Sequence, residues 1–330
     1  MKINGPVNVI RLEGIIHDIK KIIYIYFDHH YPINKQTKCD GYLNYDIVTY
    51  LNKEFIKVDD KNIDFFMETS FNQESELLKN INYKDRYIDE INKFFISNII
   101  IKNNKNLGTK INKNIRFHYV DIRESFKTQS FHKLFQSIKN IINENKNYKD
   151  YKKYIDTILD ELDKLKNILK ESDNKIIYKL KTKYKYPDIK DKLNILLNKL
   201  YVDIDILKIN VKNIETIKDA EIIYLELIGV YSWLMDIYFL RRFLDKDYIN
   251  HSIIYCGSGH SLRYIHFLIR EFNFKITHAA YITKPIGLVN EILRNYESYD
   301  IANDNEIYRI FNSPDNIQCI DISSFPDNFS

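Results

Sequence analysis

Short apolar runs alternate with segments of helical periodicity in the first third of the chain. Three runs, Ile22–Tyr26, Asp64–Met67 and Ile115–Val120, are rich in β-branched and aromatic residues, which predicts buried strands. Between them, Tyr45–Phe55 and about 83–100 carry apolar residues at helical spacing, which predicts two helices. Strands that alternate with helices are typical of βαβ units, so these strands are expected to lie parallel.

The pattern changes after this first part. From about Ser137 to Asn213 the chain is rich in Lys, Asn, Asp and Glu, with Leu and Ile at helical spacing, which predicts a helical insertion or cap. Its alternating charges are most simply a solvated surface. The strand pattern returns at Ser252–Tyr255, which leads into a helix around Leu262–Ile269, and a last short strand is expected around Ile317–Ile320.

These elements predict one α/β domain over residues 1–330 with a helical insertion at 137–213. We expect three layers, in which helices flank a central mixed, mainly parallel sheet. A length of 330 residues would also allow two domains. The longest apolar stretch, Ile222–Leu240, contains Glu226 and Asp236, so it is interpreted as a buried helix and not as a membrane span.

Composition narrows the class of protein. With 45% hydrophobic and 28% charged residues the chain can bury a core, and 49 basic against 45 acidic residues give a net charge of only +4. No specific nucleic-acid partner is therefore expected. The three cysteines, Cys39, Cys256 and Cys319, form no CxxC pair, which argues against a zinc ribbon or a disulfide scaffold. Because the N-terminus also lacks a signal-peptide pattern, we expect a cytoplasmic, reducing location.

Polar residues stand where several predicted strands end. Asp28, His29 and His30 follow the first strand, Glu68 follows the second, and His260 follows a late one. The carboxyl ends of strands in an open α/β sheet converge on one ligand cleft, so these side chains are expected to meet.

Imidazole and carboxylate groups together suit a divalent cation such as zinc, manganese or iron. His30, Glu68 and His260 are therefore the predicted metal ligands. Each also has a simpler structural interpretation, since a lone histidine at a strand end is more often hydrogen-bonded than metal-bound. Glu68 could equally begin a helix or pair with Arg123, and Asp121 and Arg123 could brace the end of their strand.

The sequence Gly257-Ser258-Gly259 lies between a predicted strand and a helix, a position used for nucleotide binding. Gly257, Ser258 and Gly259 are thus candidate cofactor-binding residues, although Leu262 replaces the third glycine of the dinucleotide motif. The glycines would also let the backbone turn tightly beside a ligand. Cys256 is interpreted as a buried thiol.

The order of these motifs resembles the superfamily that joins TraB/PrgY, Tiki proteases, GumN, ChaN and the erythromycin-esterase-like proteins. In RRFLDKDYINHSIIYCGSGHSLRYIHFL, Arg242 resembles the family's helix arginine, and Gly257–His260 resembles its second G-x-x-H motif. Glu68 in IDFFMETS falls at the family's strand-end glutamate. Asp121 and Arg123 in YVDIRES resemble its Asp-Arg pair.

The first G-x-x-H motif of that superfamily is matched less closely. Phe27-Asp28-His29-His30 keeps the histidine, but Phe27 stands in place of the glycine. The resemblance covers about Ile22–Arg123 and Glu221–Phe274. The chain also resembles uncharacterised giant-virus proteins, in line with a composition typical of an AT-rich genome.

The resemblance implies an EreA/ChaN-like α/β fold with a site of two histidines and a glutamate. Tiki-like members are metal-dependent proteases, erythromycin-esterase-like members hydrolyse a lactone, and ChaN binds haem. Since these activities differ, membership does not name a substrate.

The first hypothesis is a metal-dependent hydrolase for a small-molecule or peptide substrate. His30, Glu68 and His260 would bind the ion or activate water, while Asp28 or His29 would orient a ligand or shuttle a proton. Arg242 or Arg123 would stabilise a developing oxyanion. The alternatives are an inactive binding or virion-associated protein of the same fold and, third, a nucleotide or S-adenosylmethionine binding enzyme. The oligomeric state and the role of the insertion stay open.

Overall fold

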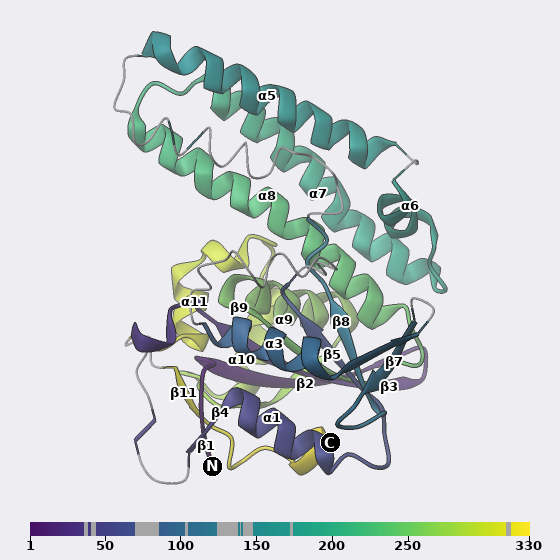
Figure 1. Cartoon of the computed structure of the whole chain (residues 1–330). Coiled ribbons are helices and arrows are strands. Elements are labelled where there is room, and N and C mark those ends of the chain that lie inside the picture. The colour runs from purple at the N-terminus through teal and green to yellow at the C-terminus, as the bar shows by residue number, and fades with distance from the viewer. Residues whose placement is uncertain are drawn as a thin grey trace. The chain divides into compact units, whose positions relative to one another are not determined.

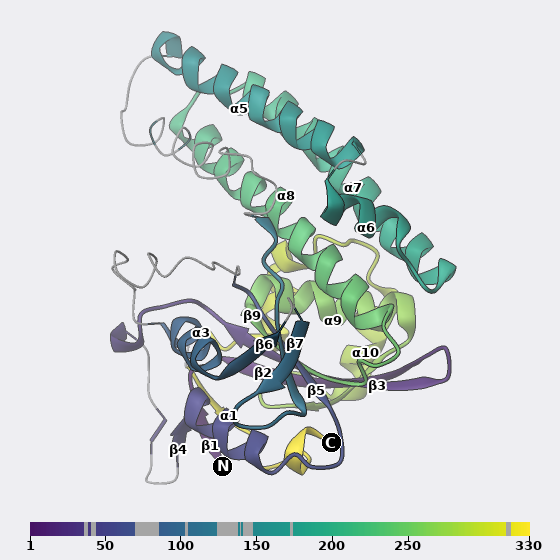
Figure 2. The same cartoon turned by 45° about the vertical axis from the view of Figure 1, so that its right-hand side comes forward.

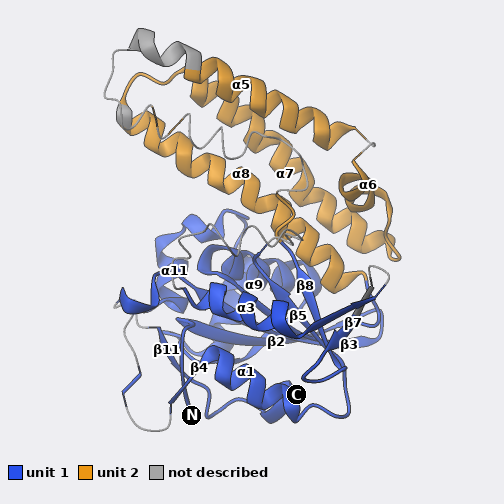
Figure 3. Ribbon diagram, viewed as in Figure 1, with its two compact units in different colours: residues 1–120, 246–330 blue, residues 121–245 orange. Residues whose placement is uncertain are grey.

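The computed structural model describes residues 1–35, 39–40, 44–69, 86–102, 105–123, 138, 140, 148–171, 174–314 and 318–330. They fall into two compact units, coloured separately in Figure 3. Unit 1 comprises residues 1–120 and 246–330, and unit 2 comprises residues 121–245. Each unit is described here by itself.

Unit 1 holds all the strands among the described residues, together with five α-helices (Figure 1). The strands are β1 (Lys2–Asn4), β2 (Asn8–Ile16), β3 (Ile19–Asp28), β4 (Asn44–Asp46), β5 (Ile63–Met67), β6 (Ile99–Lys102), β7 (Lys105–Thr109), β8 (Ile115–Tyr119), β9 (His251–Gly257), β10 (Lys275–Ala279) and β11 (Cys319–Asp321). The helices are α1 (Ile47–Ile56), α3 (Tyr87–Asn98), α9 (Ser258–Phe272), α10 (Ile286–Asn295) and α11 (Asn305–Phe311), with short 3-10 turns at Ile33–Lys35, Ile301–Asn303 and Asp327–Phe329.

Six strands form the central mixed sheet of unit 1, in the order β10-β2-β3-β9-β5-β8. The neighbours β3, β9, β5 and β8 pair in parallel. At the other edge, β2 pairs antiparallel with both β3 and β10. A three-stranded sheet, β11-β1-β4, and the hairpin β6-β7 complete the strand pairing in the described part of the unit.

Alternate residues of the central strands build the main core. Tyr24 and Tyr26 of β3, with Phe65 of β5, belong to one buried cluster with side chains of α1 and α3. Because strand side chains alternate between faces, Phe27 lies on the opposite face, where its ring stacks on Phe311 of α11. Helices therefore cover residues from both faces of this sheet, as Figure 2 also lets the reader follow.

Unit 2 is built from helices. They are α5 (Tyr148–Lys170), α6 (Lys175–Thr182), α7 (Pro187–Lys212) and α8 (Ile217–Leu244), which bring the total to nine α-helices over the described residues. Pro187 begins α7, where its missing N–H costs nothing, and Thr216 caps α8 by a reciprocal capping box with Asp219. Buried leucines of α7, such as Leu193 and Leu200, form its inner face.

The observed fold confirms the prediction of a mixed α/β protein with a mixed sheet. All five predicted strands are found at or within a few residues of the expected positions, as are the predicted helices. The β2-β3 hairpin and β10 were not predicted. They make one edge of the sheet antiparallel, so the expectation of a mainly parallel sheet describes only the part from β3 to β8. The unit boundaries at 121 and 245 are also wider than the insertion predicted at 137–213.

Helix α8 contains the stretch that the sequence analysis interpreted as buried. Its segment Lys218–Leu244 is long and apolar enough to cross a membrane by length and composition, and is the one such helix among the residues described. However, 61% of its apolar window is buried within the fold. The helix is therefore weak evidence for a membrane span.

The cysteines differ from the prediction. Cys39 and Cys319 form a disulfide whose Cα atoms lie 5.1 Å apart, although they are 280 positions apart in the sequence. The sequence argued against a scaffold held together by disulfides and did not predict this single long-range bond. Spacing along the chain could not reveal that β11 pairs with β1 beside Cys39. Cys256 is a buried thiol that is not part of a disulfide, as predicted.

Candidate functional site

The candidate site lies at the carboxyl ends of β3, β9 and β5 in unit 1. In the parallel register, Asp28 at the end of β3 is opposite Gly257 at the end of β9. Met67, the last residue of β5, is opposite Tyr255 of β9. Glu68 follows at once, and its backbone N–H donates to the carbonyl of Tyr255 over 3.2 Å. The sheet therefore brings three segments that are distant in sequence to one edge, as predicted.

Two histidines converge on one carboxylate at this edge. His30 Nε2 lies 3.4 Å from Glu68 Oε2, and His260 Nε2 lies 3.2 Å from Glu68 Oε1. The side chain of Glu68 is only 9% exposed and that of His260 only 10%. The structure thus brings together the three residues for which the sequence predicted a shared site.

His30 is held from its other side by Asp28. The Asp28 carboxylate, almost fully buried at the end of β3, accepts a hydrogen bond from His30 Nδ1 over 2.7 Å. Its second oxygen accepts one from Gln318 Nε2 over 3.1 Å. The backbone of His30 has φ of 57°, a left-handed conformation that histidine adopts more readily than bulkier residues. The turn is therefore made at His30, whereas Phe27 is an ordinary buried strand residue.

Gly257 allows the two strand ends to approach each other. Its N–H donates to Glu68 Oε2 over 2.7 Å and so orients the carboxylate. A methyl group at this position would lie 3.3 Å from His30 Nε2, closer than most real contacts, and 3.4 Å from Glu68 Oε2, an ordinary contact. A glycine is needed here for space beside the site, since its φ of −60° suits any residue.

The charges in the cluster stabilise one another. Burial would lower the pKa of His30, but the hydrogen bonds and charges of Asp28 and Glu68 outweigh it and raise this pKa to about 10. Burial would raise the pKa of Glu68, but the two imidazoles hold it well below its usual value. In contrast, burial lowers the pKa of the neighbouring His29. His30 is therefore an imidazolium held between the carboxylates of Asp28 and Glu68. The imidazole of His260 contacts the other oxygen of Glu68.

No group of three or more His, Cys, Asp or Glu side chains in the described part of the chain is arranged around a point where a metal ion would sit. At the candidate site the imidazole nitrogens contact the Glu68 oxygens directly. The three side chains can therefore bind and transfer protons without a metal ion between them. The donor types, two imidazoles and a carboxylate, are nevertheless those that zinc, manganese and iron prefer.

The remaining cofactor-binding candidates lie beside the cluster. Ser258 and Gly259 begin helix α9, directly after Gly257. A phosphate at this helix end would have to compete with Glu68 for the Gly257 N–H. The geometry therefore favours a carboxylate-based site over a nucleotide site at this junction. Cys256 Sγ lies 3.3 Å from Ser261 Oγ, and the thiol is buried.

The two predicted arginines belong to unit 2. Arg123 forms a two-point ion pair with Asp121, with contacts of 2.8 and 2.7 Å, so the Asp-Arg pair of the sequence is a real pair. Arg242 is half-buried in the last turn of α8. Neither belongs to the cluster of unit 1, and their role as oxyanion stabilisers stays a prediction.

Two features of the site had no signal in the sequence. Gln318 reaches Asp28 from the C-terminal segment, where glutamine has no distinctive pattern. The adjacent residue, Cys319, is bonded to Cys39. Both depend on how the ends of unit 1 pair, which local periodicity does not encode.

Comparison with known proteins assigns a family. A family of unknown function (DUF5847) matches residues 1–177 and 209–330, which together are most of the chain. The chain belongs to this family. Two uncharacterized proteins of Acanthamoeba polyphaga mimivirus, R706 and R161, are each 30% identical to it. The R706 alignment covers 99% of this chain and 96% of the relative, and the R161 alignment covers 100% and 98%.

These relatives confirm the predicted kinship with giant-virus proteins. They share nearly the full length of this DUF5847 member, including both parts that carry the candidate site. No solved structure shows a significant match. The matches thus give the family, while the chemistry has to be argued from the site.

Proposed function

We propose that this DUF5847 protein is a hydrolase whose reaction centre is the His30–Glu68–His260 cluster, assisted by a divalent metal ion. One observation carries the proposal: two imidazole Nε2 atoms from different strand ends meet at the two oxygens of one buried carboxylate. Such convergence of titratable groups at strand ends is typical of catalytic sites in α/β proteins.

The donor set supports a metal ion. Ligand atoms about 2.1 Å from a tetrahedrally bound ion lie roughly 3.4 Å from one another. The nitrogen–oxygen distances of 3.4 and 3.2 Å are also those of direct ion pairs, so the donor types, and not their present arrangement, support the ion. In addition, His30 has a carboxylate on Nδ1, the partner that metal-bound histidines usually have. His30, His260 and Glu68 would hold the ion, which when bound would polarise a carbonyl and activate water.

The other residues have supporting roles in this proposal. Asp28 fixes the ring of His30, and the Gly257 N–H fixes the carboxylate of Glu68. His29, which burial keeps largely neutral, is proposed to shuttle a proton. Arg123 and Arg242 belong to unit 2, so this proposal gives them no role at the cluster of unit 1.

The direct contacts between the rings and Glu68 favour a second candidate, a hydrolase without metal. In that version Glu68 holds the two imidazoles, and His260 removes a proton from the attacking water. In this version no ion has to fit between the three side chains, so they can stay in contact.

Elemental analysis of the purified protein, dialysed without chelator, tests the metal. We expect near-stoichiometric zinc, manganese or iron in the wild type and its loss in His30→Ala and His260→Ala. His251→Ala is the matched control, because His251 lies at the opposite end of the same strand, β9, and should leave the metal content unchanged. Full metal content in His260→Ala would overturn the ligand assignment.

Hydrolysis of a panel of esters, lactones and peptides tests the activity. A chelator that abolishes turnover, with recovery on adding the ion, would support the metal-assisted version. Turnover that resists chelation but is lost in Glu68→Gln would favour the metal-free version. If neither occurs with any substrate, the chain is better described as a binding or virion-associated protein.

The proposal also covers the substrate class, the location and the architecture of unit 1. The substrate is proposed to be a small molecule or peptide, acted on in the host cytoplasm or in the virion. The resemblance to the TraB, Tiki and ChaN superfamily supports a hydrolase with two histidines and a glutamate. Its three-layer, mainly parallel EreA/ChaN-like architecture is proposed for unit 1 on the same grounds.

A further inference from the structure

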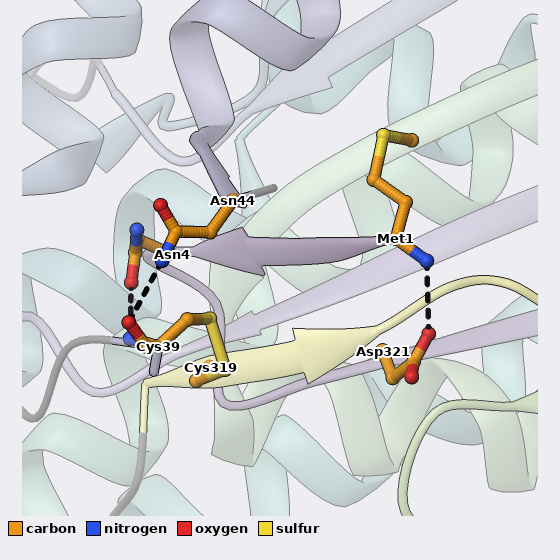
Figure 4. The surroundings of a disulfide bond; sticks show 6 residues. All are labelled: Met1, Asn4, Cys39, Asn44, Cys319 and Asp321. Atoms are coloured by element: carbon orange, nitrogen blue, oxygen red, sulfur yellow. Dashed lines mark hydrogen bonds and ion pairs between the residues drawn. A yellow bond between two sulfur atoms is a disulfide. The ribbon is translucent and has the colours of Figure 1, made fainter. Parts of the chain in front are cut away.

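The Cys39–Cys319 disulfide joins two segments of unit 1 that are far apart in the sequence (Figure 4). Cys319 begins β11, which pairs antiparallel with β1, and it lies opposite Asn4. Cys39 belongs to the segment that follows His30 and precedes β4. The crosslink therefore joins the segment after β3 to the segment that carries Gln318.

Gln318 connects this crosslink to the reaction centre. Its backbone carbonyl accepts a hydrogen bond from Gly5 N–H over 3.0 Å, which extends the β1-β11 pairing by one residue. Its side chain, only 1% exposed, donates to Asp28 Oδ1 over 3.1 Å. Asp28 in turn binds His30 Nδ1. A continuous path of contacts thus runs from the disulfide through Gln318 and Asp28 to His30.

The backbone of Cys39 also makes two hydrogen bonds that do not depend on the disulfide. Cys39 N–H donates to Asn4 Oδ1 over 2.6 Å, and the Cys39 carbonyl accepts from Asn44 Nδ2 over 2.8 Å (Figure 4). Cys39 is buried and Cys319 is half-buried. Breaking the crosslink is therefore expected to loosen the contact between Cys39 and Cys319 while the hydrogen bonds of Cys39 to Asn4 and Asn44 remain.

We propose that Gln318 is a positioning residue for the Asp28–His30 pair, and that the Cys39–Cys319 disulfide makes this positioning depend on redox state. In the oxidised protein Gln318 holds Asp28, which fixes the ring of His30 toward Glu68. A dithiol reductant supplies two electrons and two protons: the S–S bond breaks, each sulfur gains a hydrogen, and the dithiol becomes a cyclic disulfide. The inference rests on the proposed function of His30, although its test requires no turnover.

The test follows the Nδ1–H of His30 by proton–nitrogen NMR of the full chain. A proton held between His30 and Asp28 gives a downfield imidazole resonance with slow solvent exchange, and His30→Gln assigns it by removal. We expect dithiothreitol to raise its exchange rate about tenfold, as for the loss of one hydrogen bond to a charged group. Backbone spectra recorded in parallel show that the protein stays folded.

Variants separate the two parts of the proposal. Gln318→Met keeps the length of the side chain but removes the donor, so it should raise the exchange rate even in the oxidised protein. Asn290→Leu is the matched control, because Asn290 is another amide, bonded to the backbone of Ile276 in β10 and away from Asp28. The double variant Cys39→Ser/Cys319→Ser should have the same exchange rate as the reduced protein, and dithiothreitol should not change that rate.

Two results would overturn the inference. An unchanged resonance in Gln318→Met would show that Gln318 does not position Asp28. An unchanged exchange rate after full reduction, verified by thiol titration, would show that the disulfide has no influence on the site. If the resonance responds as expected but no substrate is hydrolysed, the proposed function fails while the redox coupling stands.

Discussion

At the scale of single residues, the site depends on Gly257, which has no side chain. Gly257 lies between His30 and Glu68 at the end of β9, and its N–H is bonded to the Glu68 carboxylate. Because the backbone conformation at this position suits any residue, the glycine is explained by space alone. A substitution of Gly257 by alanine therefore tests the effect of the added methyl group without a contribution from backbone strain.

Gly257→Ala should therefore disturb the cluster directly. The new methyl group would lie 3.3 Å from His30 Nε2, so the His30 ring must shift by a few tenths of an ångström, while Glu68 Oε2 at 3.4 Å would be in ordinary contact. We expect the free energy of unfolding to fall by about 1 kcal/mol. Affinity for manganese or zinc, measured by calorimetry, should fall by about tenfold if the cluster binds the ion.

Gly259→Ala is the control for this substitution. Gly259 lies in the first turn of α9, and the nearest atom to an added methyl group is Ala302 Cβ at 3.8 Å. Alanine should be tolerated or slightly stabilising there, since it favours helix more than glycine does. Equal effects of the two variants would contradict the assignment of Gly257 to the site.

The residues of the site differ in how far sequence could find them. Asp28, Glu68 and His260 were predicted because polar groups directly after buried strands share one edge of a parallel sheet. Gln318 and the Cys39–Cys319 pair were not, because their contacts depend on pairing between β1 and β11, near opposite ends of the chain. Such long-range pairing has no local periodicity.

At the scale of elements, helix α9 connects the site to the rest of unit 1. Its His266 is buried, and the Nε2–H donates to the carbonyl of Tyr296 over 2.9 Å. Burial lowers the pKa of His266 below its ordinary 6.5, and the hydrogen bond to Tyr296 offsets this only in part. The neutral ring is thus the form that fits the folded helix.

This burial predicts a loss of stability in acid. Above pH 6.5 the ring is neutral in both states, so His266 contributes no pH dependence there. As the pH falls below 6.5, the unfolded chain takes up a proton that the folded protein resists, and the free energy of unfolding falls until the folded pKa is reached. His266→Gln, which keeps a donor for Tyr296, should remove this part of the decline in urea titrations at pH 7 and pH 5.

The same substitution at exposed His17 is the matched control. It should leave the difference between the two pH values unchanged from that of the wild type. Other buried histidines contribute equally to the wild type and to both variants, so they cancel in the comparison. An identical decline in His266→Gln would show that His266 does not carry it.

Elements were predicted well where their pattern was local. The apolar run of β3 and the helical spacing of α3 are each sufficient to identify the element. The N-terminal strand β2 was missed, because its apolar run is interrupted by Arg11, Glu13 and Gly14. Arg11 is nonetheless buried, since its guanidinium donates to Thr277 and to the carbonyl of Ser330. A buried, fully bonded arginine in a strand cannot be distinguished from a surface residue by periodicity.

At the scale of the whole molecule, the boundaries of the two units differ from the boundaries that composition predicts. The change in composition begins near residue 137, but unit 2 begins at residue 121 and also includes α8, an apolar helix with many buried residues. Composition therefore marks where the surface becomes strongly charged. It does not mark where contacts divide the chain.

The disulfide makes this division experimentally accessible. Cys39 and Cys319 both belong to unit 1, while the loop that they close contains all of unit 2. Crosslinks that close long loops restrict the unfolded chain most, so reduction should lower the stability of unit 1 by about 2–5 kcal/mol. Unit 2 has no cysteine and is expected to keep its own stability.

Trp233 lets the two units be followed separately, because it is the single tryptophan of the chain and lies buried in α8 of unit 2. Its fluorescence reports the unfolding of unit 2, while hydrogen exchange of β3 and β9 reports that of unit 1. With dithiothreitol we expect the β3 and β9 amides to exchange at lower denaturant, and the tryptophan transition to stay in place. Cys39→Ser/Cys319→Ser should show the same shift without reductant. If the tryptophan transition moves together with the strands, the units unfold as one and the disulfide stabilises the entire chain.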